Sequence, residues 1–238
     1  MGRRRRLKRV EALDVWRSLC VFGMVVYHAI YDLVLFGRLD GAVLRTLPVQ
    51  ALHWSVAVGF ILISGIAARF SRGGLRRGFA VFCAGLAVTL ATTWVGLPVR
   101  FGILHFLGAA MMLCARLRPT LFPEEREPRT WQPALFLALF ALTAVWTSRV
   151  TIPVRWLYPL GFRYAGFYSA DYYPLLPWIF LYALGAWLGG VILVHRDKGL
   201  FTRRFPPALT FAGRHSLLIY LLHQPVLYGL CRLLFRIN

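Results

Sequence analysis

Residues 12–36, ALDVWRSLCVFGMVVYHAIYDLVLF, form an apolar run that is long enough to cross a lipid bilayer as a helix. Basic residues at positions 3–6, 8 and 9 precede this run, and Asp14 and Arg17 lie in its first turns. A secretory signal sequence would be shorter, would lack these charges and would end in a small-residue cleavage site. We therefore predict that residues 12–36 are retained as the first membrane span.

The composition of the whole chain is that of an integral membrane protein. Of its 238 residues, 58% are hydrophobic and 16% are charged, and the mean hydropathy is +0.60. Charged residues make up about a quarter of an ordinary globular chain. The net charge of +19 is typical of nucleic-acid binding, but the basic residues lie in short clusters between apolar runs. We interpret these clusters as topology signals and expect no nucleic-acid partner.

Seven apolar runs, bounded by charges, proline or glycine, predict the membrane spans. We predict one domain over residues 1–238, with an all-α fold that is a polytopic transmembrane helix bundle of about seven spans. In this topology, 19 of the 28 Lys and Arg residues fall on the side of the N-terminus. The positive-inside rule then places the N-terminus in the cytoplasm. The predicted spans are residues 12–36, 51–70, 77–97, 101–117, 131–148, 174–194 and 212–234.

His28 and Asp32 are the most informative ionisable residues within a predicted span. Asp32 follows His28 by four residues and therefore lies on the same helix face, one turn further along. A carboxylate in this position accepts a ring N–H, fixes the tautomer and makes His28 a general base. A structural His–Asp pair that links two helices explains the spacing equally well.

Four further ionisable residues, His53, His105, Asp171 and His223, fall in or beside the outer half of the predicted bundle. A single membrane histidine is usually a helix-to-helix hydrogen bond, whereas a concentration in one leaflet indicates a polar cavity. The histidines have none of the local spacings of a zinc site, so we expect no metal. The four cysteines lie within apolar runs and form no Cys-x-x-Cys pair, so we expect small buried residues rather than disulfides.

Four segments carry a resemblance to a known family: residues 12–33, 101–108 (FGILHFLG), 171–178 (DYYPLLPW) and 213–225 (GRHSLLIYLLHQP). In this order they resemble the bacterial members of the heparan-alpha-glucosaminide N-acetyltransferase catalytic-domain family. Two features are also similar to the wider transmembrane acyltransferase group. They are the spacing of ten residues between Arg17 and His28, and the Ser-to-His-x-Pro pattern that ends at Pro225.

This resemblance implies a transmembrane acyltransferase that moves an acetyl group from cytoplasmic acetyl-CoA to a sugar or amino sugar at the outer side. It further implies a multi-pass protein of the cell inner (plasma) membrane, whose partners are membrane lipids and a carbohydrate or lipid-linked sugar. His28 would deprotonate the acceptor, and Asp32 would orient the ring. The residues implied to bind CoA are Arg17, Arg214 and His215, and those implied to bind substrate are Arg17, His53, His105, Asp171, Trp178 and His223.

One departure from the family bears on the identity of the base. The eukaryotic enzymes resemble this chain with Asn in place of His28, and their catalytic His lies in the following luminal loop. Residues 29–52 contain no His here, so the base is His28 or lies elsewhere, with His53 the nearest candidate.

Two other functions are consistent with the same residues. A multi-pass transporter or channel-like protein would line a solute or proton pathway with the outer-facing His/Asp cavity. A structural membrane subunit would tolerate replacement of its histidines. A transporter usually connects both faces through repeated halves, and the sequence contains no repeat, which favours the enzyme.

Overall fold

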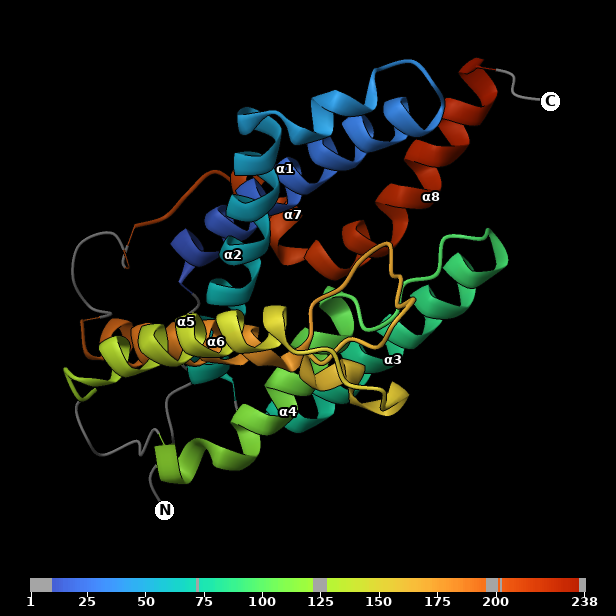
Figure 1. The fold of residues 1–238 in the computed structure, drawn as a ribbon. Coiled ribbons are helices and arrows are strands. Elements are labelled where there is room, and N and C mark those ends of the chain that lie inside the picture. Colours follow the sequence, from blue (N-terminus) through green and yellow to red (C-terminus); the bar gives the residue numbers. More distant parts are fainter. Residues whose placement is uncertain (1–9, 72, 122–127, 196–200, 202, 236–238) are drawn as a thin grey trace. The chain divides into compact units, whose positions relative to one another are not determined.

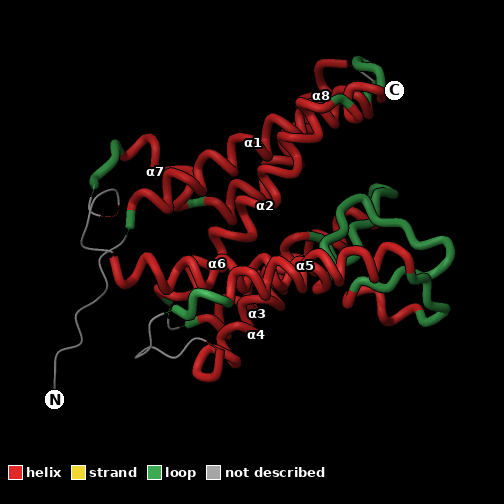
Figure 2. Tube along the Cα trace, turned by 60° about the vertical axis from the view of Figure 1, so that its left-hand side comes forward, coloured by secondary structure: helices red, strands yellow, loops and turns green. Residues whose placement is uncertain are grey.

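The computed structural model describes residues 10–71, 73–121, 128–195, 201 and 203–235, and in these ranges it contains helices and no strand (Figures 1 and 2). The predicted all-α fold is therefore confirmed. In chain order, the elements are α1 (Glu11–Leu35), η1 (Gly41–Arg45), α2 (Leu47–Phe70), α3 (Gly74–Trp94), α4 (Ile103–Leu121), α5 (Gln132–Arg149), η2 (Arg155–Leu160), α6 (Leu175–His195), α7 (Pro207–Arg214) and α8 (Ser216–Phe235).

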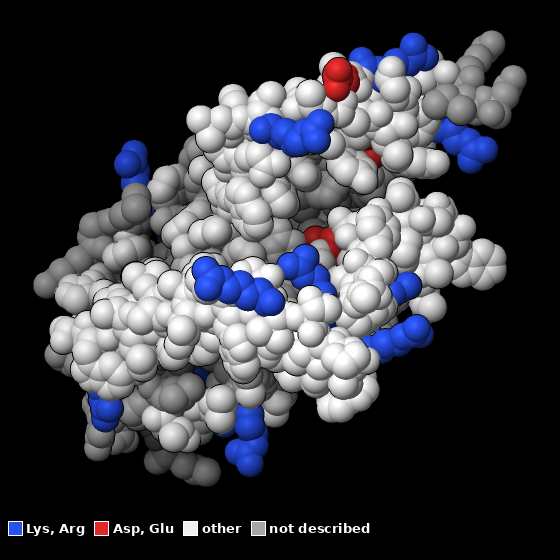
Figure 3. All heavy atoms as spheres, viewed as in Figure 1, with Lys and Arg blue, Asp and Glu red and all other residues white. Residues whose placement is uncertain are grey.

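Several of these helices are apolar enough to identify a membrane protein. Within the described ranges, five helices have the length and composition needed to cross a membrane: α1, α2, α3, α6 and α8. Large parts of the surface seen in Figure 3 carry no charged side chain. The seven spans and the cytoplasmic N-terminus stay predictions, and the basic cluster at residues 3–9 lies outside the described residues.

Several of the predicted boundaries differ from the structure: α3 is Gly74–Trp94 instead of residues 77–97, and α4 ends at Leu121 instead of residue 117. The second and last spans differ as well. The second span was expected from residue 51, but α2 begins at Leu47, because Pro48 lies in the first turn, where a helix needs no N–H from it. The last span was expected from residue 212, but α7 ends at Arg214 and α8 begins at Ser216. His215 lies between them as the C-cap of α7.

The chain divides into two compact units, and each is described by itself. The first unit consists of residues 1–63 and 196–238. Within it, α1 packs against α7, α8 and η1 (Figure 1). The backbone N–H of Gly213 in α7 donates to the Ser18 hydroxyl of α1 at 2.7 Å. This unit is therefore organised around α1.

The second unit consists of residues 64–195. Its main helix pairs are α3 with α4 and α5 with α6, and α4 also contacts α6. Phe106 and Ala186 are fully buried, and the ring of Phe106 meets that of Tyr182 edge to face at a centroid distance of 6.4 Å. The core of this unit thus lies between α4 and α6.

Gly108 determines how closely α3 and α4 approach. A Cβ atom at this position would lie 2.6 Å from the backbone nitrogen of Phe82 and 2.7 Å from the carbonyl oxygen of Gly78. Both of these atoms belong to the backbone of α3, which cannot move as a flexible side chain does. Small residues at helix interfaces are the usual means by which membrane helices reach such contact.

We predict that Gly108→Ala separates α3 from α4 and lowers the free energy of unfolding by ~1–3 kcal/mol, the usual cost of overpacking. The matched control is Gly229→Ala in α8, where an added Cβ meets nothing within 4 Å. Gly229→Ala should leave the free energy of unfolding unchanged or raise it by ~0.5–1 kcal/mol, because alanine favours the helix more than glycine does. The measurement is the thermal unfolding midpoint of both variants in detergent, and equal shifts would contradict the proposed contact.

Candidate functional site

Two histidines from different helices meet in the first unit. The ring centroids of His28 on α1 and His223 on α8 lie 4.7 Å apart, with an interplanar angle of 77°. His28 is partly buried, and His223 is only 8% exposed. The structure therefore brings together two residues that lie almost 200 positions apart in the sequence.

The hydrogen bonds of these two rings determine their tautomers. The Nδ1 atom of His28 lies 2.9 Å from the Met24 carbonyl oxygen, and that of His223 lies 2.6 Å from the Tyr220 carbonyl oxygen. A carbonyl oxygen can only accept, so Nδ1 carries the hydrogen in both rings, and in the neutral form of each ring Nε2 holds the lone pair. The Nε2 atom of His223 is buried and has no hydrogen-bond partner. Both neutral rings thus have an Nε2 atom able to accept a proton, as a general base requires.

A third histidine joins this group through Tyr27. The ring of Tyr27 stacks on His53 of α2 at a centroid distance of 4.6 Å and meets His28 edge to face at 5.5 Å. Three histidines that the sequence analysis singled out therefore belong to one cluster in the first unit: His28, His53 and His223.

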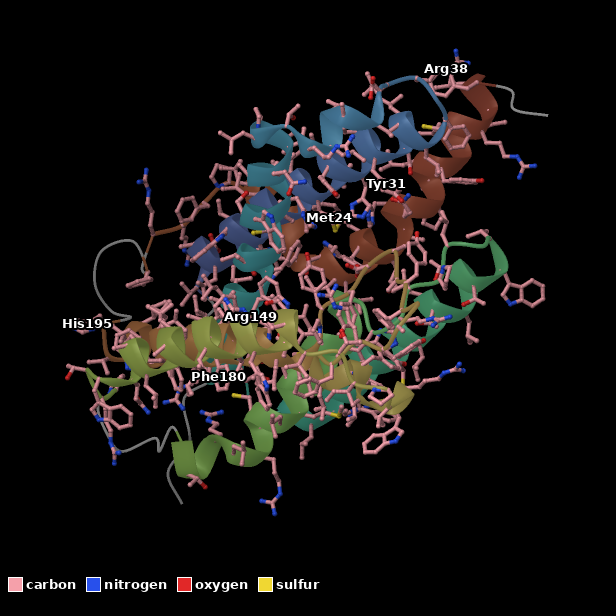
Figure 4. All side chains as sticks on the ribbon, viewed as in Figure 1. Met24, Tyr31, Arg38, Arg149, Phe180 and His195 are labelled. Carbon is pink, nitrogen blue, oxygen red and sulfur yellow. The ribbon has the colours of Figure 1, made fainter. Side chains whose placement is uncertain are left out.

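The partner predicted for Asp32 is wrong. Asp32 does not hold the His28 ring: its Oδ1 accepts from Nε2 of Gln224 on α8 at 2.7 Å, and its Oδ2 has no hydrogen-bond partner. The reason is the direction of the ring, because helical side chains lean toward the N-terminus and Nδ1 of His28 reaches back to Met24. Figure 4 labels Met24 and Tyr31, which lie before and after His28 along α1.

His105 lies in the second unit, in a tightly packed environment. It is 4% exposed and lies beside the rings of Phe82 and Phe101. Its Nε2 lies 3.4 Å from the hydroxyl oxygen of Thr89, which itself donates to the Val99 carbonyl at 2.7 Å. Because the single hydroxyl hydrogen goes to Val99, Nε2 of His105 is the donor to Thr89. This arrangement supports a structural role in joining α3 to α4.

Asp171 has a structural role at the N-terminus of α4. Its Oδ2 accepts from the backbone N–H of Ile103, the first residue of that helix, at 2.9 Å. The adjacent loops are also paired, since the Tyr173 N–H donates to the Phe101 carbonyl at 3.0 Å. Burial raises the pKa of the Asp171 carboxyl to about 6, and the hydrogen bond from Ile103 acts in the opposite direction. Asp171 is therefore a helix cap contributed by a distant loop.

Trp178, the last predicted substrate-binding residue, packs among aromatic side chains of the second unit. Its ring lies 5.5 Å from that of Phe140 on α5 and 5.3 Å from that of Tyr173, measured between centroids. The structure thus places His105, Asp171 and Trp178 in the second unit, and His28, Asp32, His53 and His223 in the first.

The residues predicted to bind CoA lie where α1 meets α7 and are already paired with acids. Arg17 Nη1 lies 2.9 Å from Oδ1 of Asp14, and Arg214 Nη2 lies 3.7 Å from Oε1 of Glu11. The side chains of Arg17 and Arg214 are 20% and 38% exposed. A guanidinium has five N–H donors, so an ion pair with one carboxylate does not by itself use all of them.

His215 differs from these arginines because it forms no ion pair with an acid among the described residues. Its Nδ1 lies 3.0 Å from the Phe211 carbonyl, and its ring lies 4.5 Å from that of Phe211. The side chain is exposed at the junction of α7 and α8. It therefore adds an accessible imidazole beside Arg214.

The sequence interpretation missed three residues of the first unit: Glu11, Asp14 and Gln224. The spacing of Asp14 and Arg17, three residues apart on one helix, was a usable signal for their ion pair. Gln224 directly follows His223, but nothing in its local sequence indicates a partner on α1.

Comparison with known proteins gives one family match. Residues 9–225 match the family model described as heparan-alpha-glucosaminide N-acetyltransferase, catalytic. Neither the curated proteins nor the solved structures give a significant match.

The pKa of Asp171 leads to a prediction about stability and pH. The carboxyl changes from an ordinary value of 3.8 when unfolded to about 6 when folded, so the folded state holds the proton more tightly. The stability that it contributes is fully present below its unfolded pKa and is lost as the pH rises through its folded value. Between pH ~4 and ~7, the parent protein should therefore lose stability relative to Asp171→Asn, which keeps an acceptor oxygen and does not ionise.

The control for this experiment is Asp171→Ala, which removes the cap at every pH. Because neither variant ionises at this position, the free energy of unfolding of Asp171→Ala should lie ~1 kcal/mol below that of Asp171→Asn at both ends of the range. Thermal unfolding midpoints of the three proteins in detergent test this. If the unfolding midpoints of the parent and Asp171→Asn change with pH in parallel, the raised pKa of Asp171 is contradicted.

Proposed function

Because the chain belongs to the family described as heparan-alpha-glucosaminide N-acetyltransferase, catalytic, we propose that it is a membrane acyltransferase that uses acetyl-CoA. The acceptor we propose is a sugar or amino sugar, free or linked to a lipid, at the outer side of the cell inner (plasma) membrane. The five apolar helices support the membrane location.

The observation that carries this proposal is the contact of the His28 and His223 rings at a centroid distance of 4.7 Å, with Nε2 of His223 unpartnered among the described residues. We assign His28 as the general base that removes a proton from the acceptor hydroxyl or amine. The resulting nucleophile attacks the thioester carbonyl, the carbon–sulfur bond breaks, and the proton passes from His28 to the departing CoA thiolate. Atoms and charges then balance, and His28 returns to its neutral form.

The tautomer of His223 decides between two possible roles for this residue. Its Nδ1–H is taken by Tyr220, so the neutral ring has no N–H left to stabilise an oxyanion. Its buried Nε2 can accept from an acceptor hydroxyl or amine. We therefore assign His223 to orienting the acceptor, next to the base.

The donor end of the reaction is proposed at the start of α1. Arg17 and His28 are 11 residues apart on this helix, which corresponds to ~16 Å along its axis. Arg17, Arg214 and His215 would hold the CoA phosphates at one end of α1, and the histidine cluster would hold the acceptor toward the other. One helix thus carries both parts of the proposed site.

We predict that His28→Ala lowers acetyl transfer by at least ~100-fold, because general-base catalysis contributes about that much or more. The matched control is His195→Ala. His195 makes the same ring-to-carbonyl hydrogen bond four residues back, to Val191 at 3.0 Å, but lies exposed at the end of α6 (Figure 4). The measurement is transfer of label from radiolabelled acetyl-CoA in membranes, with glycan and lipid fractions separated.

The outcomes of this assay separate the candidate functions. Label that depends on His28 and not on His195 supports the proposal and identifies the acceptor fraction. Equal labelling by the parent and His28→Ala would contradict the assignment of His28 and make His53 the candidate general base. No labelling and no CoA binding by the parent would favour the transporter or channel-like function.

We also predict that Arg17→Ala weakens acetyl-CoA binding at least ~10-fold, as expected for loss of one charge-assisted contact, whereas Arg232→Ala does not. Arg232 is an exposed arginine at the far end of α8 in the same unit. Calorimetric binding of acetyl-CoA to the purified variants tests this order, with thermal unfolding measured alongside because Arg17 also pairs with Asp14. Stronger loss with Arg232→Ala would refute the donor site.

A further inference from the structure

Asp32 is a fully buried carboxyl with an incomplete set of hydrogen bonds. It is 0% exposed, and its Oδ1 accepts one hydrogen bond, from Nε2 of Gln224 at 2.7 Å. Within the part of the chain that the structure describes, two buried atoms of the same two side chains have no hydrogen-bond partner: Oδ2 of Asp32 and Oε1 of Gln224. The pair therefore has one unpartnered oxygen on each side.

An ionised Asp32 leaves both of these oxygens without a donor. A carboxylate and an amide oxygen can only accept, so they cannot satisfy each other. Among the described residues, no lysine or arginine forms an ion pair with Asp32. An unpaired charge at membrane depth is strongly unfavourable, and so is a buried acceptor without a donor.

A single proton removes both problems. A carboxylic acid has one O–H donor and one carbonyl acceptor, and a carboxamide likewise has an N–H donor and an acceptor oxygen. Oδ2–H of Asp32 can then donate to Oε1 of Gln224, while Nε2–H of Gln224 donates to Oδ1. Each group donates once and accepts once.

We infer that Asp32 is a protonated carboxylic acid, held by Gln224 in a two-bond acid–amide pair that joins α1 to α8. Gln224 is then a positioning residue, because it fixes α8 directly beside His223. This inference goes beyond the proposed acetyl transfer, and its test measures a proton rather than turnover.

The other titratable groups of this region do not supply a counter-charge. His28 lies one turn before Asp32 on α1, and His223 precedes Gln224 on α8, and each ring donates Nδ1–H to a carbonyl of its own helix. A positive charge on either ring would itself have the cost of a charge at membrane depth. Cys231 of α8 is the other titratable group near Asp32, and a thiol carries no positive charge. The acid–amide pair is therefore uncharged within an uncharged surrounding.

The test is the infrared difference spectrum of the purified full chain, parent minus Asp32→Asn, at neutral pH. A protonated Asp32 gives a positive carboxylic-acid C=O band above the amide I region, whereas an ionised Asp32 gives carboxylate stretching bands instead. The matched control is Asp40→Asn, since Asp40 is an exposed carboxyl whose Oδ1 accepts from the Ala42 N–H at 2.7 Å. Its difference spectrum should contain carboxylate bands only.

Variant stabilities give a second readout. Asp32→Asn has the donor and acceptor of the protonated acid, so its thermal unfolding midpoint should stay close to that of the parent. Gln224→Leu removes the partner and should lower the midpoint by several degrees. In the double variant D32N/Q224E an acid and an amide are again opposite each other, so the midpoint should rise above that of Gln224→Leu.

Two results would overturn the inference. Carboxylate bands in the parent minus Asp32→Asn spectrum would show that Asp32 is ionised. A midpoint for Asp32→Asn as low as that of Gln224→Leu would show that the pair requires the charge. If Asp32→Asn does not fold, the parent minus Gln224→Leu spectrum decides. Because loss of Gln224 changes the hydrogen bonds of Asp32, a protonated Asp32 gives a shifted pair of carboxylic-acid C=O bands, whereas an ionised Asp32 gives shifted carboxylate bands.

Discussion

The hydrogen bond from His28 Nδ1 to the Met24 carbonyl constrains the first unit more than any other contact, because it sets both the tautomer and the direction of the ring. With the hydrogen on Nδ1, the lone pair is on Nε2, on the side of the ring away from the helix axis. The ring then meets His223, which has the same tautomer through its bond to Tyr220. The same backward lean leaves Asp32 free to pair with α8.

The two ends of α1 have different chemistry. Near its start, Glu11 and Asp14 pair with Arg214 and Arg17, which joins α1 to α7 by charge. Further along, Asp32 joins α1 to α8 through an amide. In these charged pairs the arginine side chains are 20% and 38% exposed although Asp14 is buried, and the pair further along α1 is formed with a neutral group. This division is what the cost of charge in a membrane interior leads us to expect.

The sequence predicted the helices well but the contacts of the site only in part. The first predicted span, 12–36, differs from α1 by one residue at each end, because an apolar run in a membrane forms a helix to satisfy its own backbone. The start of α2 was missed because Pro48 ends a helical pattern in sequence but is tolerated in a first turn. The i,i+4 spacing placed Asp32 on the face of His28 but gave no ring direction. Its real partner, Gln224, is 192 positions away, beyond the reach of any local pattern.

The polar groups left without partners indicate which substrate the histidine pair suits. Several threonine hydroxyls within the helices donate back to their own helix, as Thr92 does to Val88 at 2.8 Å and Thr143 to Leu139 at 2.6 Å. The rings of His28 and His223 likewise use their N–H on their own helices. What remains at this pair is acceptor capacity, so a ligand must bring the hydrogen. A thioester carbonyl brings none, whereas a hydroxyl or amine does, and the histidine pair is therefore suited to the acyl acceptor rather than to the acyl donor.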